Sequence, residues 1–245
     1  SFILHFSGSR EMEFEIPLVL MGEGEVKVER RTEDGEELVH VDNGVLSFDV
    51  MDGFGGSLIR LKKDGVTYLD DNFPEPEPKS YFENHLGGIQ PRFMTPGDMD
   101  SFYEIEEVDS EPFEQGIWKG VRVDVTVEKM DSLRGQKFSV RYLTLPGSDL
   151  VRVVIIHRNP KEREVEWLGE LFVDAMIDGS LEDMKVTFSG KYEDWSRLHG
   201  TQQFTPPLNV ENPWFIFEKG YNSLCCFALE DSTGFSWVLC NDDVN

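Results

Sequence analysis

The sequence has few cysteines, few basic residues and no long apolar run. The three cysteines, Cys225, Cys226 and Cys240, are an odd number and include an adjacent pair, so they do not make the framework of a disulfide-rich domain. Their spacing does not suit zinc either. We interpret them as small buried residues in a reducing compartment, which predicts a cytoplasmic protein. A bridge from Cys225 or Cys226 to Cys240 remains an alternative.

The lack of basic residues excludes several classes of partner. With 23 Lys and Arg against 47 Asp and Glu, the formal net charge is −24. Such a surface repels nucleic acids and anionic membranes, so we expect neither as a partner. No apolar run reaches the roughly eighteen residues of a transmembrane helix, and the first residues lack the pattern of a signal peptide. The densest acidic run, 104–114, lacks calcium-loop spacing, so we expect no metal and no cofactor.

Helical periodicity is also scarce, whereas short alternating segments are common. In 121–129, valines occupy one face and Arg122, Asp124 and Thr126 the other, which is typical of a half-buried strand. Asp64-Gly65 is a hairpin dipeptide. The sequence therefore predicts an antiparallel all-β protein. Further segments of this kind are 45–52, 56–71, 137–159, 164–177, 184–190, 214–220, 224–231 and 235–241.

Three segments interrupt this pattern. The proline-rich 74–79 predicts an extended surface connection, and 201–213 predicts a long loop. Residues 192–200 are interpreted as a single helical turn or a loop. The length of 245 residues suits one large β domain, so we expect one domain over residues 1–245, which could also be a piece of a longer protein.

The order of local features resembles the galactose mutarotase-like superfamily, which includes aldose epimerases, hexose-6-phosphate epimerases and β domains of other carbohydrate-active enzymes. Four stretches carry this resemblance: 42–69, 84–93, 118–127 and 142–179. The first contains an Asn-Gly turn, a strand and a glycine-rich turn, and the second contains a histidine close to Gly-Gly and a later arginine. The resemblance implies a single antiparallel β-supersandwich with very little helix, and a sugar or oligosaccharide as the ligand.

The sequence departs from the epimerases where catalysis would occur. Leu86 separates His85 from Gly87, whereas the epimerases have the histidine directly before Gly-Gly. Residues 170–179 lack the family's second histidine, and its C-terminal glutamate has no clear counterpart. We therefore favour a domain that binds sugar, or an accessory module of a carbohydrate-active protein. An aldose or hexose-6-phosphate 1-epimerase is the first alternative, and a structural or interaction domain without a ligand is the second.

The candidate catalytic residues follow from the chemistry of mutarotation, in which one group removes a proton from the anomeric hydroxyl and another protonates the ring oxygen. His85 is the first acid candidate, because the following Gly-Gly allows close approach of a ligand. His157 is the second, and Asp174, amid apolar residues, is a candidate carboxylate. The alternatives are a polar residue beside a turn for His85, a core residue for His157 and a solvent-facing residue for Asp174.

Four other residues are candidates for sugar binding. Arg92 can bind hydroxyl groups or a sugar phosphate, and Gln90 is expected near it. Trp195 and Trp214 flank the predicted long loop and could stack on the apolar face of a sugar, although tryptophans are more often core residues. Arg92 could instead form a surface ion pair. The sequence does not indicate an oligomeric state.

Overall fold

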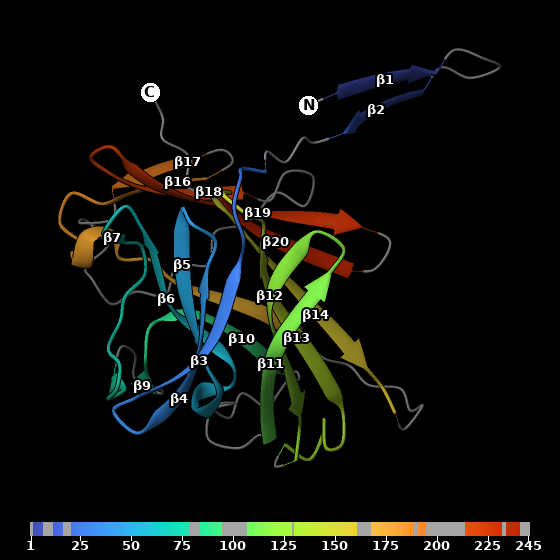
Figure 1. Ribbon diagram of the computed structural model, residues 1–245, viewed down its shortest axis with the longest axis vertical. Coiled ribbons are helices and arrows are strands. Elements are labelled where there is room, and N and C mark those ends of the chain that lie inside the picture. Colours follow the sequence, from blue (N-terminus) through green and yellow to red (C-terminus); the bar gives the residue numbers. More distant parts are fainter. Residues whose placement is uncertain are drawn as a thin grey trace.

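The computed structural model describes residues 2–6, 12–16, 21–78, 84–94, 107–128, 130–160, 168–188, 191–194, 214–231 and 234–240, and its strands form two large sheets (Figure 1). All paired strands in these ranges are antiparallel. They contain two single turns of 3-10 helix, η1 (Asp52–Phe54) and η3 (Ile177–Gly179), and no α-helix. The predicted all-β antiparallel fold with very little helix is confirmed.

The first sheet has seven strands in the order β15-β10-β6-β5-β4-β3, with β7 paired to β6. Its strands are β3 (Lys27–Glu33), β4 (Glu36–Asp42), β5 (Leu46–Met51), β6 (Ser57–Lys63), β7 (Val66–Thr67), β10 (Gly88–Met94) and β15 (Leu168–Asp174).

The second sheet has nine strands in the order β11-β12-β13-β14-β20-β19-β18-β16-β17. Its strands are β11 (Glu107–Gln115), β12 (Trp118–Thr126), β13 (Lys137–Thr144), β14 (Leu150–Arg158), β16 (Lys185–Phe188), β17 (Lys191–Asp194), β18 (Trp214–Lys219), β19 (Asn222–Asp231) and β20 (Gly234–Cys240). Two short ribbons pair β1 (Phe2–Phe6) with β2 (Met12–Ile16), and β8 (Glu77–Pro78) with β9 (Asn84–His85).

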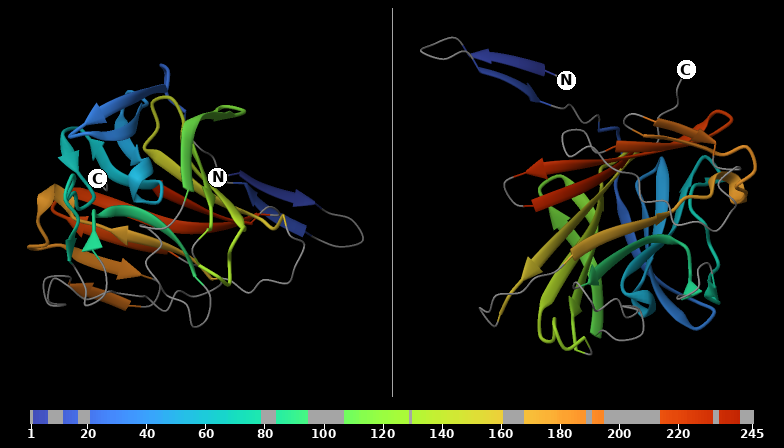
Figure 2. Two further views of the ribbon diagram at one scale, coloured as in Figure 1. Left: turned by 90° about the horizontal axis from the view of Figure 1, so that it is seen from below. Right: turned by 180° about the vertical axis from the view of Figure 1, so that it is seen from behind.

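The two large sheets pack against each other (Figure 2). One continuous apolar cluster fills the space between them. Period-two alternation explains its composition, because every second residue of a strand points to the same face. Both sheets contribute aliphatic and aromatic side chains that are at most 1% exposed. Among them are Val39, Val41, Phe48, Val50, Leu58, Val121, Val123, Val125, Phe138 and Val140.

The turn at Asn43-Gly44 connects the two sheets. Asn43 is fully buried, and its Nδ2 donates to the Thr144 hydroxyl at 2.7 Å and to the carbonyls of Leu145 and Ser148 at 2.9 and 2.7 Å. Its Oδ1 accepts two backbone amides of its own turn. This Asn-Gly pair, part of the resemblance seen in the sequence, therefore fixes the β4–β5 turn against the β13–β14 turn.

Some expectations about single segments need correction. Residues 191–194 form strand β17 paired with β16, so the helical turn or loop predicted over 192–200 is wrong for 192–194, because cross-strand pairing outweighs local preference. Residues 195–200 and the predicted loop 201–213 lie outside the described residues. Within the described ranges, no helix has the length and apolarity that a membrane span requires.

Candidate functional site

A β-bulge in β6 directs an arginine to the outer face of the first sheet. Asp49 pairs with Arg60 and Val50 pairs with Leu58, so Ile59 is an extra residue opposite β5. Leu58 and Leu61 both lie in the central core. Because of the bulge, Ile59 and Arg60 both face outward, Ile59 into a small apolar cluster and Arg60 among polar side chains.

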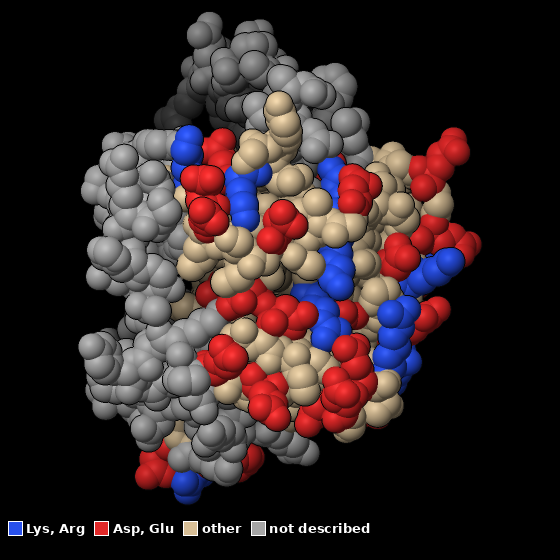
Figure 3. Space-filling model, turned by 90° about the vertical axis from the view of Figure 1, so that its left-hand side faces the viewer, with Lys and Arg blue, Asp and Glu red and all other residues tan. Residues whose placement is uncertain are grey.

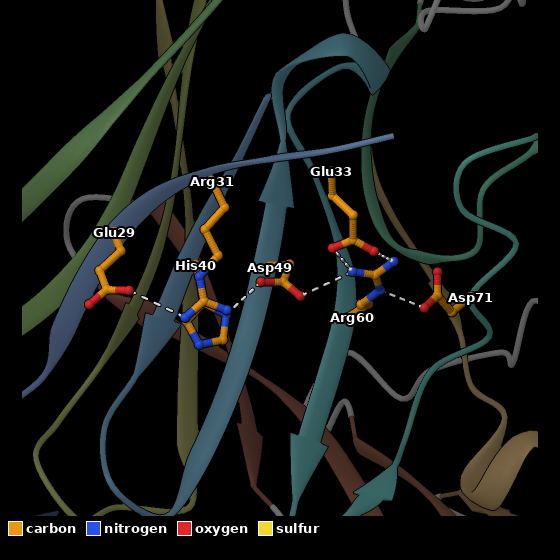
Figure 4. A network of polar contacts seen from close by, with 7 residues as sticks. All are labelled: Glu29, Arg31, Glu33, His40, Asp49, Arg60 and Asp71. Carbon is orange, nitrogen blue, oxygen red and sulfur yellow. Dashed lines mark hydrogen bonds and ion pairs between the residues drawn. The ribbon is translucent and has the colours of Figure 1, made fainter. Parts of the chain in front are cut away.

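Three polar side chains form a ladder across this outer face (Figure 4). His40 on β4 lies directly opposite Asp49 on β5, which lies directly opposite Arg60 on β6. The Nδ1 atom of His40 is 2.6 Å from Oδ1 of Asp49, and Nη1 of Arg60 is 3.6 Å from Oδ2 of Asp49. Asp49 therefore joins a histidine and an arginine across three neighbouring strands.

Arg60 is the centre of this arrangement. It donates two parallel hydrogen bonds of 2.9 Å to the carboxylate of Glu33, and its Nε donates to Asp71 at 2.6 Å. Its guanidinium carbon also lies 4.8 Å from the centre of the Phe73 ring. The side chain is only 14% exposed, so these contacts hold the guanidinium in one orientation.

The charged side chains of this cluster shift one another's pKa values. Burial disfavours the charge on Arg60, but its hydrogen bonds to Glu33 and Asp71 outweigh burial, so the pKa of Arg60 is raised. The hydrogen bond from Arg60 is also the main reason why the pKa of Glu33 is below its ordinary value. Arg60 and Glu33 are therefore both ionised at neutral pH.

These side chains line a depression of about 410 Å³ on the outer face of the first sheet. That size lies within the range of about 300–1,000 Å³ for small-molecule sites. Figure 3 shows the corresponding side of the molecule, where acidic and basic side chains are interspersed. The lining residues are all polar: Arg31, Glu33, His40, Ser47, Asp49, Arg60, Lys62 and Asp71. Among the described residues, no cluster of three or more His, Cys, Asp or Glu side chains is arranged to hold a metal ion.

The Gly-Gly pair, expected to form a turn, lies beside this depression, but Gly88 begins strand β10 and Gly87 lies in an isolated β-bridge, so the pair leads into a strand. Asp71, which binds Arg60, also forms an isolated β-bridge with Gly87. Gly87 and Gly88 have φ angles of +85° and +86°, a left-handed backbone conformation that favours glycine. The segment 84–94 therefore supports the Asp71 side of the site.

The predicted residues of β10 and β15 lie near this Gly-Gly pair. Gln90 is fully buried and its Nε2 donates to the Gly87 carbonyl at 2.9 Å. Asp174 lies directly opposite Gly88. Because Ile89 and Val173 both pack in the core, Gln90 and Asp174 share the outer face of the first sheet.

For the other predicted residues apart from His157, the structure describes the backbone at most. His85 ends β9, and Arg92 pairs with Glu170 in the register of β10 and β15; their side chains are outside the described set. Trp214 begins β18 opposite Phe227, and its side chain is also outside that set, as is the whole of Trp195.

His157 lies on the inner face of the second sheet, at the edge of the core. Its ring stacks on Phe138 with a centroid distance of 4.8 Å, and its Nε2 lies 2.8 Å from Oε1 of Gln136. The Gln136 amide nitrogen donates to Asn159, so its oxygen is left to accept from a His157 ring that carries its proton on Nε2. The structure therefore does not bring His157 and Asp174 to the same face.

We expect the stability of the protein to depend on the protonation of His157. Burial lowers the pKa of His157 below 6.5, so between that pKa and 6.5 the unfolded state binds more protons than the folded state. Wild-type stability then falls as the pH drops through this window. His157→Gln removes this titration. As the pH falls from about 7.5 to 5, the unfolding free energy of wild type should therefore decrease more than that of the variant. Urea denaturation of both proteins over this pH range tests the prediction. It would be contradicted if the unfolding free energies of wild type and variant changed in parallel with pH.

The comparisons with known proteins concern the fold. No protein-family model matches the sequence, and no curated protein matches it either. Among solved structures, the chain is similar to galactose 1-epimerase from Lactobacillus acidophilus NCFM, with a TM-score of 0.52 and 11% sequence identity. The match covers 90% of this chain and 100% of the epimerase chain. The protein thus has a galactose mutarotase-like fold, as the order of its sequence features predicted.

Proposed function

We propose that the protein is a carbohydrate-binding domain, acting alone or as an accessory module, and that it binds the hydroxyl groups of a sugar in the depression around Arg60. The observation that carries this proposal is the depression itself, a recess on the outer face of the first sheet whose lining is entirely polar. The fold, which a galactose 1-epimerase shares, supports a sugar as the ligand class.

The lining suits a ligand with many hydroxyl groups. Planar carboxylates such as Asp49 and Glu33 accept hydrogen bonds, and guanidinium groups donate them in a fixed plane. Because Arg60 is already held by three partners, its geometry is set before a ligand arrives.

The charge balance of the depression favours a neutral ligand. Three cations, Arg31, Arg60 and Lys62, face three carboxylates, Glu33, Asp49 and Asp71. The lining is thus close to neutral although the chain has a formal net charge of −24. A neutral sugar can exchange hydrogen bonds with both kinds of group without leaving a charge unpaired.

The placement of the predicted catalytic residues supports binding rather than epimerisation. Mutarotation needs an acid and a base that face the same sugar ring. His157 lies between the sheets against Phe138, whereas Asp174 lies on the outer face of the first sheet. We therefore expect polarimetry with freshly dissolved galactose or glucose to show no acceleration of mutarotation, and a clear acceleration would favour the epimerase.

Substitutions in the lining should weaken sugar binding. A glycan panel first identifies a ligand, and calorimetry then measures its dissociation constant. Ser47→Ala and Lys62→Ala each remove one hydrogen-bonding group, so we expect each to raise Kd roughly tenfold. Both residues are on the depression, and neither belongs to the Arg60 ladder, so the fold should be unaffected.

Lys119→Ala is the matched control. Lys119 is a partly exposed lysine on β12 of the other sheet, 2.9 Å from Glu114, and its loss should leave Kd unchanged. If no member of the panel binds, the alternative of a structural domain without a ligand is favoured. If a sugar binds equally to wild type and both lining variants, the site lies elsewhere on the protein.

A further inference from the structure

Arginines gather on the outer face of the second sheet, although acidic residues outnumber basic ones in the chain as a whole. Val121 and Val123 on β12 point into the core, so Arg122 points outward. The same alternation places Arg141 on β13 and Arg152 on β14 on this face. In a protein with a formal net charge of −24, three arginines on three successive strands are an exception that requires a reason.

The strand register brings two of these like charges together. Arg122 lies directly opposite Arg141, and like charges in directly opposed positions destabilise a sheet. Burial, followed by the proximity of Arg122 and Arg158, lowers the pKa of Arg141. An anion bound between these side chains would relieve this repulsion.

Aromatic rings hold the guanidinium groups in place. The guanidinium carbons of Arg122 and Arg141 lie 5.5 and 4.6 Å from the centre of the Phe113 ring. That of Arg152 lies 5.6 Å from the centre of the Trp118 ring. Stacking of this kind limits the movement of arginine side chains while leaving their N–H groups available at the edge of the plane.

Of the opposed pair Arg122 and Arg141, Arg122 takes the acidic partners in the described part of the chain. Arg122 forms ion pairs with Glu111 and with Asp124, whose Oδ2 is 3.0 Å from its Nε. Arg141 donates to the neutral Gln115 at 3.1 Å, and within the described part of the chain it makes no ion pair. The buried Nε of Arg141 has no hydrogen-bond partner there. Arg141 therefore retains donors that no described carboxylate uses.

We propose that Arg122, Arg141 and Arg152 bind the oxyanion group of a small ligand, a carboxylate or a phosphate or sulfate ester. Guanidinium groups match such groups in charge and geometry and bind them through paired hydrogen bonds. Phe113 and Trp118 supply apolar surface for the rest of the ligand. This site lies on the other sheet from the depression around Arg60, and it stands whether or not a neutral sugar binds there.

Calorimetry at constant ionic strength tests this site with three probes: inorganic phosphate, inorganic sulfate and galacturonate. We expect saturable binding of at least one of them, and Arg141→Gln should raise its Kd roughly tenfold because a charged hydrogen-bond donor is lost. Arg152→Gln gives a second, independent variant. Arg134→Gln is the control, since Arg134 is an exposed arginine in the turn between β12 and β13 and pairs with Asp131.

Thermal unfolding gives a second readout. The bound probe should raise the Tm of wild type and of Arg134→Gln, but not that of Arg141→Gln. Without a probe, Arg141→Gln should be at least as stable as wild type, because it removes the repulsion from Arg122. Binding of galacturonate but not of galactose or the inorganic ions would identify an acidic sugar as the source of the oxyanion.

Absence of saturable binding of all three probes would overturn the proposal, as would equal binding by wild type and Arg141→Gln. These results are distinct from a failure of the proposed sugar site. Neutral galactose does not need the arginine cluster, so Arg141→Gln should leave its binding unchanged, and Lys62→Ala should leave the binding of phosphate or sulfate unchanged.

Discussion

Replacing Arg60 by methionine should destabilise the protein by about 2 kcal/mol at neutral pH, because Glu33, Asp49 and Asp71 then lose the guanidinium group that they share. Methionine keeps an apolar stem beside Phe73 and removes only the charge and the hydrogen bonds. Loss of one partner of a buried ion pair costs about 3–5 kcal/mol, and Glu33 is 46% exposed, so solvent screening reduces this value. Urea denaturation of wild type and variant measures the difference.

The destabilisation should depend on pH in a defined direction. The pKa of Glu33 is depressed in the folded state, mainly by its hydrogen bond from Arg60, so its stabilising effect is present above its unfolded pKa and is lost as the pH falls through its folded pKa. The difference between wild type and Arg60→Met should therefore be largest near neutral pH and should shrink in acid. Arg134→Met, which removes an exposed arginine, should change stability by less than about 0.5 kcal/mol. A difference that grows in acid would refute the role of Arg60.

The sequence contained enough information to predict the buried strands, because alternation is strong where one face is apolar. Residues 45–52 and 121–129 illustrate this: most of each segment becomes a strand, β5 or β12. The valines of these two strands lie in the core: Val50, Val121, Val123 and Val125. Strand β3 (KVERRTE) was not predicted, because it is an edge strand whose side chains are almost all exposed and charged. Strand β11 (EVDSEPFEQ) was interpreted as an acidic run for the same reason.

The site around Arg60 could not be predicted from the sequence. His40, Asp49 and Arg60 are each a polar residue among apolar neighbours in a strand, which is the ordinary pattern of a solvated face. Two features bring them together: the register of β4, β5 and β6, and the bulge at Ile59. Neither leaves a signal in a single sequence, because register depends on long-range pairing. The left-handed conformation of Gly87 and Gly88 could be expected from the residues themselves, because glycine adopts a positive φ without steric cost.

Gly87→Ala should destabilise the protein by about 3 kcal/mol or more and should also weaken sugar binding. A Cβ atom at Gly87 would lie 2.1 Å from the Asp70 carbonyl oxygen, which is a backbone atom that moves only if the chain moves. Gly65 has a similar φ of +81° with no atom within 4 Å of such a Cβ, so Gly65→Ala isolates the cost of the left-handed conformation, about 1 kcal/mol.

The effect on sugar binding follows from the position of Asp70 next to Asp71. Asp71 bridges to Gly87 and accepts the 2.6 Å hydrogen bond from Nε of Arg60, so a displaced Asp70 backbone moves one wall of the depression. Thermal unfolding and calorimetry on Gly87→Ala and Gly65→Ala should show a large loss of stability and of affinity in the first variant, and a small loss of stability with unchanged affinity in the second. Equal stability of the two variants would show that the backbone around Asp70 yields easily. The Asp71 wall of the depression is the part that Gly87 supports, and Gly87→Ala should displace it. Unchanged affinity in a folded Gly87→Ala would therefore show that the position of Asp71 does not matter to the ligand.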